Sequence, residues 1–176
     1  MDFADPTGNI AQFGLGEGKW IADLGAGSGH YTMAAAKAVG STGRVYAVEI
    51  QKDLLPRVKN LASEEGLGNV EVLWGDIEVQ NGTKLRDESV DVVILSNILF
   101  QLDDKKGCAE ETKRILKPKG RVLIVDWDGS YGGLGPTEET VYSAADARAL
   151  FENLGFVFEG DIRAGAHHYG FSMSKA

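Results

Sequence analysis

Three alternate glycines, Gly25, Gly27 and Gly29, stand between a short apolar run and a longer amphipathic run. This arrangement constrains the fold more than any other feature of the sequence. The preceding run, residues 20–24, has the length of a buried strand and carries one carboxylate. The following run places apolar side chains at the spacing of one helical face: Tyr31, Ala34, Ala35, Ala38 and Val39. We therefore predict a strand, a tight glycine turn and a helix. A ligand can lie against the bare backbone of such a turn, where amides at the helix start favour negative charge.

The alternation of strand and helix continues along the chain. Apolar runs predict further strands at residues 44–48, 70–74, 90–95, 121–125, about 156–162 and 168–173. Helix signals between them begin at Asp53, at Asp103 and at the capping box of Ser143 and Asp146. This order predicts an α/β fold with a mostly parallel sheet covered by helices on both faces. The link at residues 163–167 is too short for a crossover, so the final pair of strands is expected to be antiparallel.

The length of 176 residues predicts a single domain over residues 1–176. We expect residues 1–18 to be a lead-in segment with a helical turn near residues 7–13, and Phe3 and Phe13 to pack on the core rather than cover a pocket. The glycine-bearing loop at residues 128–142 is a possible lid. The start of the chain lacks the basic and apolar parts of a secretory signal, and no run approaches the roughly 18 apolar residues of a membrane span.

The net charge of −8, from 26 acidic and 18 basic residues, disfavours a nucleic-acid partner. The densest basic stretch, residues 113–121, spans an expected helix end, where cations complement the helix dipole. Cys108 is the only cysteine, so no internal disulfide or zinc-type cysteine pair is expected, and a reducing, cytoplasmic setting is the default. The adjacent His167 and His168 would chelate a metal poorly, and we expect no metal site.

Polar residues end several of the predicted strands. Glu49 follows the second strand, 20 residues after Gly29, a spacing at which a carboxylate can accept hydrogen bonds from ribose hydroxyls. Asp76 ends the third strand and could accept from an adenine amine, with Ile77 packed on the ring. Ser96 and Asn97 follow the fourth strand and could face the ligand or simply cap a helix. Because carboxyl ends of parallel strands share one edge, these residues are predicted to form one site.

Three interpretations compete for the glycine turn. It could serve packing alone, or it could bind a nicotinamide or flavin dinucleotide, although His30 occupies the position where that pattern needs its third glycine. Third, residues 23–29 resemble the first motif of class I methyltransferases, an acidic residue followed by three alternate glycines. That resemblance implies S-adenosylmethionine as the cofactor, lying over Gly25, Ala26 and Gly27, with Asp23 helping to hold its amino group.

The resemblance extends over roughly residues 14–158. The segments at residues 74–102 and 116–123 are similar to class I methyltransferases of the ubiquinone/menaquinone-biosynthesis-like group. This likeness implies a Rossmann-like sheet of seven strands with one reversed, and a cofactor site formed by Asp23, Gly25, Ala26, Gly27, Glu49, Ile50, Asp76, Ile77, Ser96 and Asn97. The sequence departs from adenine- and glutamine-amine methyltransferases, because residues 96–99 lack their Pro-Pro-aromatic motif, and no added domain for a macromolecular substrate is evident.

The expected reaction is an in-line transfer of the sulfonium methyl group to a small-molecule acceptor, with positioning as the main contribution of the protein. A base is needed only if the acceptor must lose a proton, and His30, His167 and His168 are the candidates. The start of a helix disfavours a protonated histidine, which would leave His30 neutral and able to accept a proton. His30 could equally serve to fix the loop through a hydrogen bond. The alternatives are methylation of protein or RNA, a non-catalytic S-adenosylmethionine-binding protein, and a nicotinamide-dependent oxidoreductase.

Overall fold

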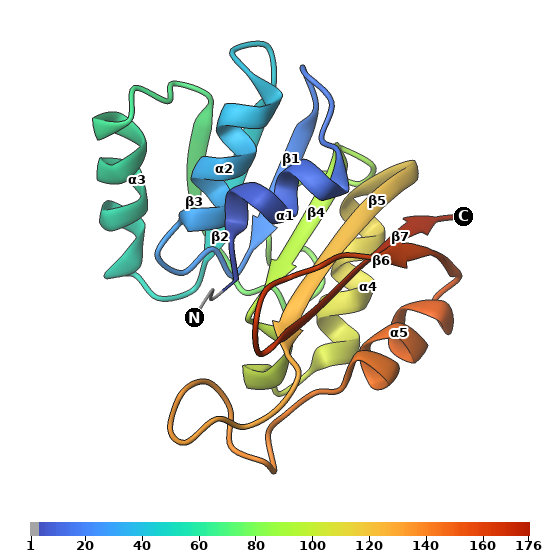
Figure 1. Ribbon diagram of the computed structural model, residues 1–176. Helices are drawn as coiled ribbons and strands as arrows, with labels where there is room; N and C mark the ends of the chain where they lie inside the picture. The colour runs from blue at the N-terminus through green and yellow to red at the C-terminus, as the bar shows by residue number, and fades with distance from the viewer. Residues whose placement is uncertain (1–3) are drawn as a thin grey trace.

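Seven strands form one sheet in the computed structural model, which describes residues 4–176 (Figure 1). The strands are β1 (Trp20–Leu24), β2 (Arg44–Glu49), β3 (Val70–Trp74), β4 (Val90–Ser96), β5 (Leu116–Trp127), β6 (Phe156–Asp161) and β7 (His168–Lys175). The helices are α1 (Pro6–Phe13), α2 (His30–Val39), α3 (Leu54–Glu64), α4 (Lys105–Ile115) and α5 (Ala144–Glu152), with a 3₁₀ turn, η1, at Leu99–Gln101.

The sheet has the strand order β3-β2-β1-β4-β5-β7-β6. Strands β1 to β5 pair in parallel, whereas β7 pairs antiparallel with both β5 and β6. The predicted fold class is confirmed, including the reversed final strand. From β1 the strands β2 and β3 follow on one side of the sheet, whereas from β4 the later strands follow on the other side. The carboxyl ends of β1 and β4 therefore mark the switch point where ligands bind in such sheets.

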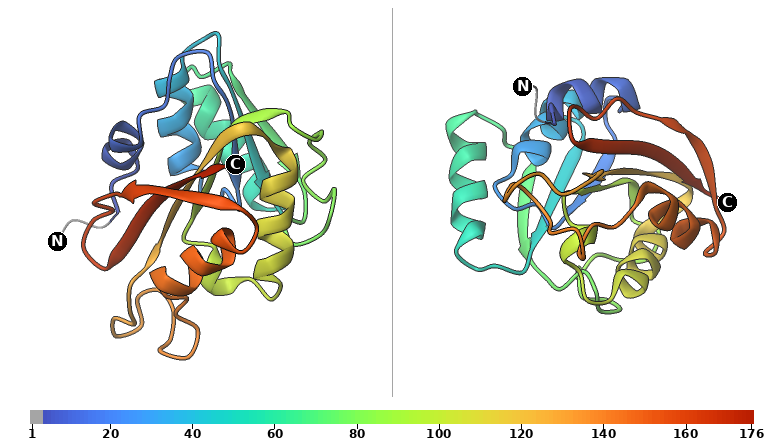
Figure 2. Two further views of the ribbon diagram at one scale, coloured as in Figure 1. Left: turned by 90° about the vertical axis from the view of Figure 1, so that its right-hand side faces the viewer. Right: turned by 60° about the horizontal axis from the view of Figure 1, so that its bottom comes forward.

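Helices cover both faces of the sheet. One face packs against α1, α2 and α3 through apolar side chains such as Phe13, Val39 and Val58. The other face packs against α4 and α5, where Ile115 and Phe151 are fully buried. Figure 2 separates these layers, with the blue-to-teal helices on one side of the sheet and the yellow and orange helices on the other.

Local signals explain several element boundaries, but Asp53 forms no side-chain cap before α3, and Asp104 rather than Asp103 caps α4. Helix α5 begins at the predicted capping box, where the Ser143 hydroxyl accepts from the Asp146 amide. Pro6 opens α1 at a position where its missing amide costs nothing, and Phe13 is buried in the core as expected. Phe3 lies outside the described residues.

The fifth strand is longer than predicted. The expected range was 121–125, because Pro118 and Gly120 read as stop signals, but β5 spans Leu116–Trp127. Leu116 pairs with Val90 ahead of an irregularity in the ladder, and Lys119 adopts a φ of 61° there. The turn-forming residues are therefore accommodated within the strand rather than before it.

Candidate active site

A hollow of about 380 Å³ opens at the carboxyl edge of the sheet, beside the switch point between β1 and β4. All the predicted cofactor-binding residues except Asp23 line it: Gly25, Ala26, Gly27, Glu49, Ile50, Asp76, Ile77, Ser96 and Asn97. Four strands and the turns that follow them therefore contribute to a single cavity.

The glycine turn forms one wall and requires its glycines. Gly25, Gly27 and Gly29 have φ values of 75°, 56° and 88°, a region that side chains disfavour. A Cβ at Gly25 would lie 2.7 Å from the side chain of Ile98, which approaches from the end of β4. The Gly25 and Ala26 amides donate to the Val48 carbonyl at 2.8 and 3.1 Å, which ties the turn to β2.

Glu49 joins the glycine turn to the end of β2. One of its carboxylate oxygens accepts from the Gly27 amide at 2.9 Å, and the other accepts from the Gln51 amide at 2.9 Å. The side chain is almost fully buried yet borders the hollow. Since each carboxylate oxygen has a further lone pair, Glu49 can still accept hydrogen bonds from a ligand.

Asp76 and Ile77 form the wall at the end of β3. One oxygen of Asp76 accepts from the Glu78 amide at 2.9 Å, which orders the turn after the strand. Ile77 is buried in the core on one side and borders the hollow on the other. A carboxylate beside an apolar side chain can bind a planar, amine-bearing ring.

Asn97 ends β4 in a left-handed conformation, with a φ of 53° that is uncommon for a residue other than glycine. Its amide donates to the Val125 carbonyl at 2.8 Å, and its carbonyl accepts from the Gln101 side chain at 2.8 Å. Its Oδ1 is buried and has no hydrogen-bond partner among residues 4–176. Strained residues with unpartnered polar atoms are frequent at ligand sites.

Asp23 lies behind the glycine turn rather than in the lining of the hollow. Its side chain is fully buried, and one oxygen accepts from the Thr32 hydroxyl at 2.6 Å. The other oxygen, Oδ1, has no partner within the described part of the chain. Burial raises the pKa of Asp23 to about 6, the Thr32 hydroxyl opposes this, and the charge of Glu49 adds to it.

The three histidines occupy different places. His30 begins α2 and lines the hollow, whereas His167 and His168 lie outside its lining. His168 is buried and packs on Trp127, with ring centroids 4.3 Å apart. Its Nδ1 lies 3.1 Å from the Ala166 carbonyl, and its Nε2 is buried without a partner in the described residues.

The loop at residues 128–142, termed the lid loop, projects beyond the carboxyl ends of the strands in Figure 1. Its Tyr131 packs on His167, with centroids 3.9 Å apart, and donates a hydrogen bond to Asp128. The Asp128 amide donates to the His167 carbonyl at 2.9 Å. The start of the lid loop is therefore held against the turn between β6 and β7.

Several residues of the hollow were not predicted from the sequence. Tyr31 was assigned only to the buried face of α2, yet it borders the hollow and accepts from the Asn9 side chain at 2.7 Å. Gln101 and Leu102 enter from η1, for which the sequence offers no distinct signal. Glu78 follows Asp76 so closely that the strand-end argument could have included it.

Asp126 positions η1 beside the hollow. Its carboxylate accepts from the Leu99 amide at 2.9 Å and from the Trp127 amide at 2.8 Å. Burial raises the pKa of Asp126 to about 6, against these backbone hydrogen bonds, which lower it. Asp126 thus links the end of β5 to the turn that carries Gln101.

None of the helices described in residues 4–176 is long and apolar enough to cross a membrane. Within the same residues, no group of three or more histidine, cysteine or acidic side chains could hold a metal ion.

The reversed final strand, the strand order and the glycine-walled hollow define a class I methyltransferase architecture. A sequence profile described as "Methyltransferase domain" matches residues 15–174, and the chain belongs to this family.

Relatives agree with this assignment. The crystal structure of a SAM-dependent methyltransferase from Aquifex aeolicus is 29% identical, with a TM-score of 0.89 over 99% of this chain and 91% of that chain. An arsenite methyltransferase of Halobacterium salinarum is 32% identical over 64% of this chain and 28% of its own length. A ubiquinone/menaquinone biosynthesis C-methyltransferase of Hydrogenovibrio crunogenus is 32% identical over 65% and 44%, respectively. The chain thus spans less than half the length of these two curated relatives.

Proposed function

We propose that this chain binds S-adenosylmethionine in the hollow and transfers its methyl group to a small-molecule acceptor. One observation supports the proposal above the others. The hollow joins the left-handed glycine turn to the carboxylates that close β2 and β3, and Glu49 bonds directly to the amide of Gly27.

The residues present fit this cofactor. A side chain at position 25 would fill the cradle, since its Cβ would meet Ile98. The charged residues that line the hollow are Glu49, Asp76 and Glu78, and no described lining residue is a lysine or arginine. Such an acidic lining suits the sulfonium and ammonium cations of S-adenosylmethionine better than the phosphates of a dinucleotide.

Each wall has a proposed role. Glu49 would accept hydrogen bonds from the ribose hydroxyls with its remaining lone pairs, beside the exposed Ile50. Asp76 would accept from the adenine amine, while Ile77 packs on the ring. Both assignments place the nucleoside between the ends of β2 and β3.

The methionine end would lie over the glycine turn, between β1 and β4. Asp23 and Asn97 each hold a buried oxygen that has no partner in residues 4–176, and an ammonium group could donate to such oxygens. Ser96, next to Asn97, lines the same wall. When bound, S-adenosylmethionine supplies the electrophilic methyl group, so the protein needs chiefly to align the acceptor with it.

The acceptor would enter between His30 and the lid loop. His30 is the histidine that borders the hollow and could accept a proton there. His168 is the second candidate base, because Nδ1 faces the Ala166 carbonyl and Nε2 would then keep a free lone pair. We propose that the lid loop excludes water from the acceptor, with His167 as its contact on the neighbouring turn.

Arsenite is not our proposed acceptor, although one relative bears that name. A soft ion of this kind selects thiolate ligands. The sole cysteine of the sequence, Cys108, is fully buried on α4, and this burial raises its pKa to about 12. A small organic acceptor fits better, and the net charge of −8 disfavours nucleic acid.

Calorimetric titration with S-adenosylmethionine tests the binding site. We expect Glu49→Ala and Asp76→Ala each to weaken affinity by about tenfold or more, which corresponds to about 1.4 kcal/mol. Glu152→Ala, at an exposed ion pair with Arg148 on α5, is a matched control and should bind as the wild type does. Unchanged affinity in both site variants would refute the assignment.

A screen of small organic acceptors with isotopically labelled methyl donor tests the reaction. Transfer of label to an acceptor supports the proposed activity. Binding without transfer to any small molecule, protein or RNA would instead favour a non-catalytic binding protein. Transfer only to protein or RNA would overturn the proposed acceptor class.

A further inference from the structure

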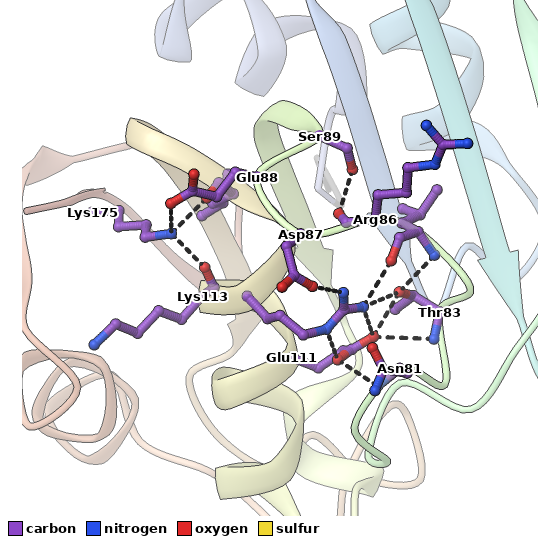
Figure 3. Close-up of polar contacts among 12 residues, drawn as sticks. Asn81, Thr83, Arg86, Asp87, Glu88, Ser89, Glu111, Lys113 and Lys175 are labelled. Atoms are coloured by element: carbon purple, nitrogen blue, oxygen red, sulfur yellow. Dashed lines mark hydrogen bonds and ion pairs between the residues drawn. The ribbon is translucent and has the colours of Figure 1, made fainter.

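Glu111 of α4 carries a carboxylate that is fully buried away from the hollow. It accepts hydrogen bonds from the Asn81 amide at 3.0 Å, the Thr83 amide at 3.2 Å and the Thr83 hydroxyl at 2.6 Å (Figure 3). All three donors belong to the loop after β3. A helix carboxylate thereby fixes the backbone of a loop that lies some 30 residues earlier in the chain.

Arg114 neutralises the charge of Glu111 and forms further hydrogen bonds to the same loop. Its Nε and Nη2 donate to the two oxygens of Glu111 at 2.8 and 2.7 Å. Its Nη2 also donates to the Leu85 carbonyl at 2.9 Å, and its Nη1 donates to the Asp87 carboxylate at 2.6 Å. Burial raises the pKa of Glu111, but the hydrogen bonds from Arg114 and Thr83 outweigh it and leave the pKa below its ordinary value.

The loop that Glu111 holds is in direct contact with residues 75–77, the segment proposed to bind the adenine ring. A Cβ at Gly75 would lie 2.5 Å from the Gly82 carbonyl, and a Cβ at Gly82 would overlap the Asp76 carbonyl. These two glycines allow the two stretches of backbone to touch. A shift of residues 81–83 toward this segment would therefore displace Asp76.

Helix α4 also supports the other end of this wall. The Asp104 amide donates to the Glu78 side chain at 2.5 Å, and a Cβ at Gly107 would overlap the Glu78 carbonyl. The Asp76 turn is therefore held between the start of α4 and the loop that Glu111 anchors.

We propose that Glu111 is a positioning residue for the adenosyl end of the ligand, acting through Asp76. This inference rests on the proposed function. Stability alone explains the arrangement poorly, because a buried ion pair is often no more stabilising than apolar side chains of similar volume. What the carboxylate provides is three directed acceptor contacts that set the position of one loop.

Glu111→Gln tests the proposal, because the amide keeps the shape but has only one acceptor oxygen. We expect the affinity for S-adenosylhomocysteine and for 5′-methylthioadenosine, which lacks the amino-acid group, to fall equally, by about fivefold or about 1 kcal/mol. Asp91→Asn is the matched control. The Asp91 carboxylate likewise accepts hydrogen bonds from a backbone amide, that of Trp20, and from a cation, the Lys117 ammonium, but it lies outside the hollow. This substitution should leave both affinities unchanged.

A double-mutant cycle separates positioning from general loosening. If Glu111 acts through Asp76, Glu111→Gln should cost about twofold or less in an Asp76→Ala background. The full fivefold loss there, or wild-type affinity in Glu111→Gln alone, would overturn the proposal. Thr83→Val, which removes one hydroxyl contact, gives a milder variant with a smaller loss in the same direction should Glu111→Gln fold poorly. Failure of the wild type to bind either ligand would instead refute the proposed function.

Discussion

Replacing Asp23 by asparagine should stabilise the ligand-free protein near neutral pH while weakening ligand binding. Asp23 is fully buried, and this burial raises its pKa from 3.8 to about 6. The folded state therefore binds this proton more tightly than the unfolded chain does. Consequently the free energy of unfolding decreases as the pH rises from about 4 to about 6.

The interval between 3.8 and about 6 corresponds to about 3 kcal/mol at 1.36 kcal/mol per pKa unit. Asparagine keeps an acceptor for the Thr32 hydroxyl but cannot ionise, so the variant avoids this loss. We expect it to exceed the wild type by about 1–3 kcal/mol at pH 7.5. The advantage should fall to about a third of this value at pH 4.5 and approach zero only below about pH 3. Asp126 titrates in the same range, but it is present in both proteins and cancels in the difference.

Urea unfolding at several pH values measures the stability, and calorimetry measures binding. S-adenosylmethionine should bind Asp23→Asn about tenfold more weakly, while 5′-methylthioadenosine, which has no ammonium group, should bind as before. Asp91→Asn is a control for which the expected change in stability has the opposite sign. Burial raises the pKa of Asp91, but its bonds from the Trp20 amide and Lys117 outweigh this, so that substitution should destabilise the protein at pH 7.5. An Asp23→Asn protein that is less stable than the wild type at pH 7.5 would refute the reasoning.

Three further substitutions test other parts of the site, and a fourth serves as a control. Gly25→Ala should lose at least about 2 kcal/mol of stability and most ligand affinity, because its Cβ would meet Ile98. Gly14→Ala, in the left-handed region at φ 72° and ψ 68° with open space around it, should lose only about 1 kcal/mol in urea unfolding and bind normally. Tyr131→Ala should raise the KM for the acceptor by about threefold or more without changing S-adenosylmethionine affinity, if the lid loop closes over the acceptor. His168→Ala should lower kcat by about 100-fold if His168 is the base, and a kcat equal to the wild type at saturating acceptor would exclude that role.

The sequence alone predicted the order of elements and the strand ends that meet at the hollow, because these depend on local signals. The glycine turn and Glu49 are linked by a spacing that follows from one strand, one turn and one helix. Once the strands are parallel, their carboxyl ends must share an edge, so Asp76 and Asn97 come to the same hollow. The seven apolar runs and the short link at residues 163–167 also predicted the number of strands and the antiparallel final pair, and the family resemblance implied the same sheet.

Long-range packing could not be predicted in this way. Glu111 is a charged residue at a helical position, which sequence patterns assign to the surface, yet it is buried with Arg114 beside a loop about 30 residues earlier. The extension of β5 through Pro118 depends on pairing of Leu116 with Val90, which local turn signals cannot reveal. The sequence also could not show that Asp23 lies behind the glycine turn, where α2 places Thr32 against one of its oxygens and leaves the other oxygen without a partner in the described residues.

The charge around the hollow helps to choose between the interpretations that the glycine turn left open. A turn that serves packing alone does not explain why three carboxylates, those of Glu49, Asp76 and Glu78, border one cavity. A dinucleotide would bring phosphates toward the same carboxylates, and no described lysine or arginine lines the hollow to offset them. A cationic ligand would instead be attracted to these carboxylates. The unpartnered oxygen of Asp23, with a pKa of about 6, is an acceptor that an ammonium group would keep ionised at neutral pH. The same acidic lining that argues against NAD therefore favours an adenosyl sulfonium.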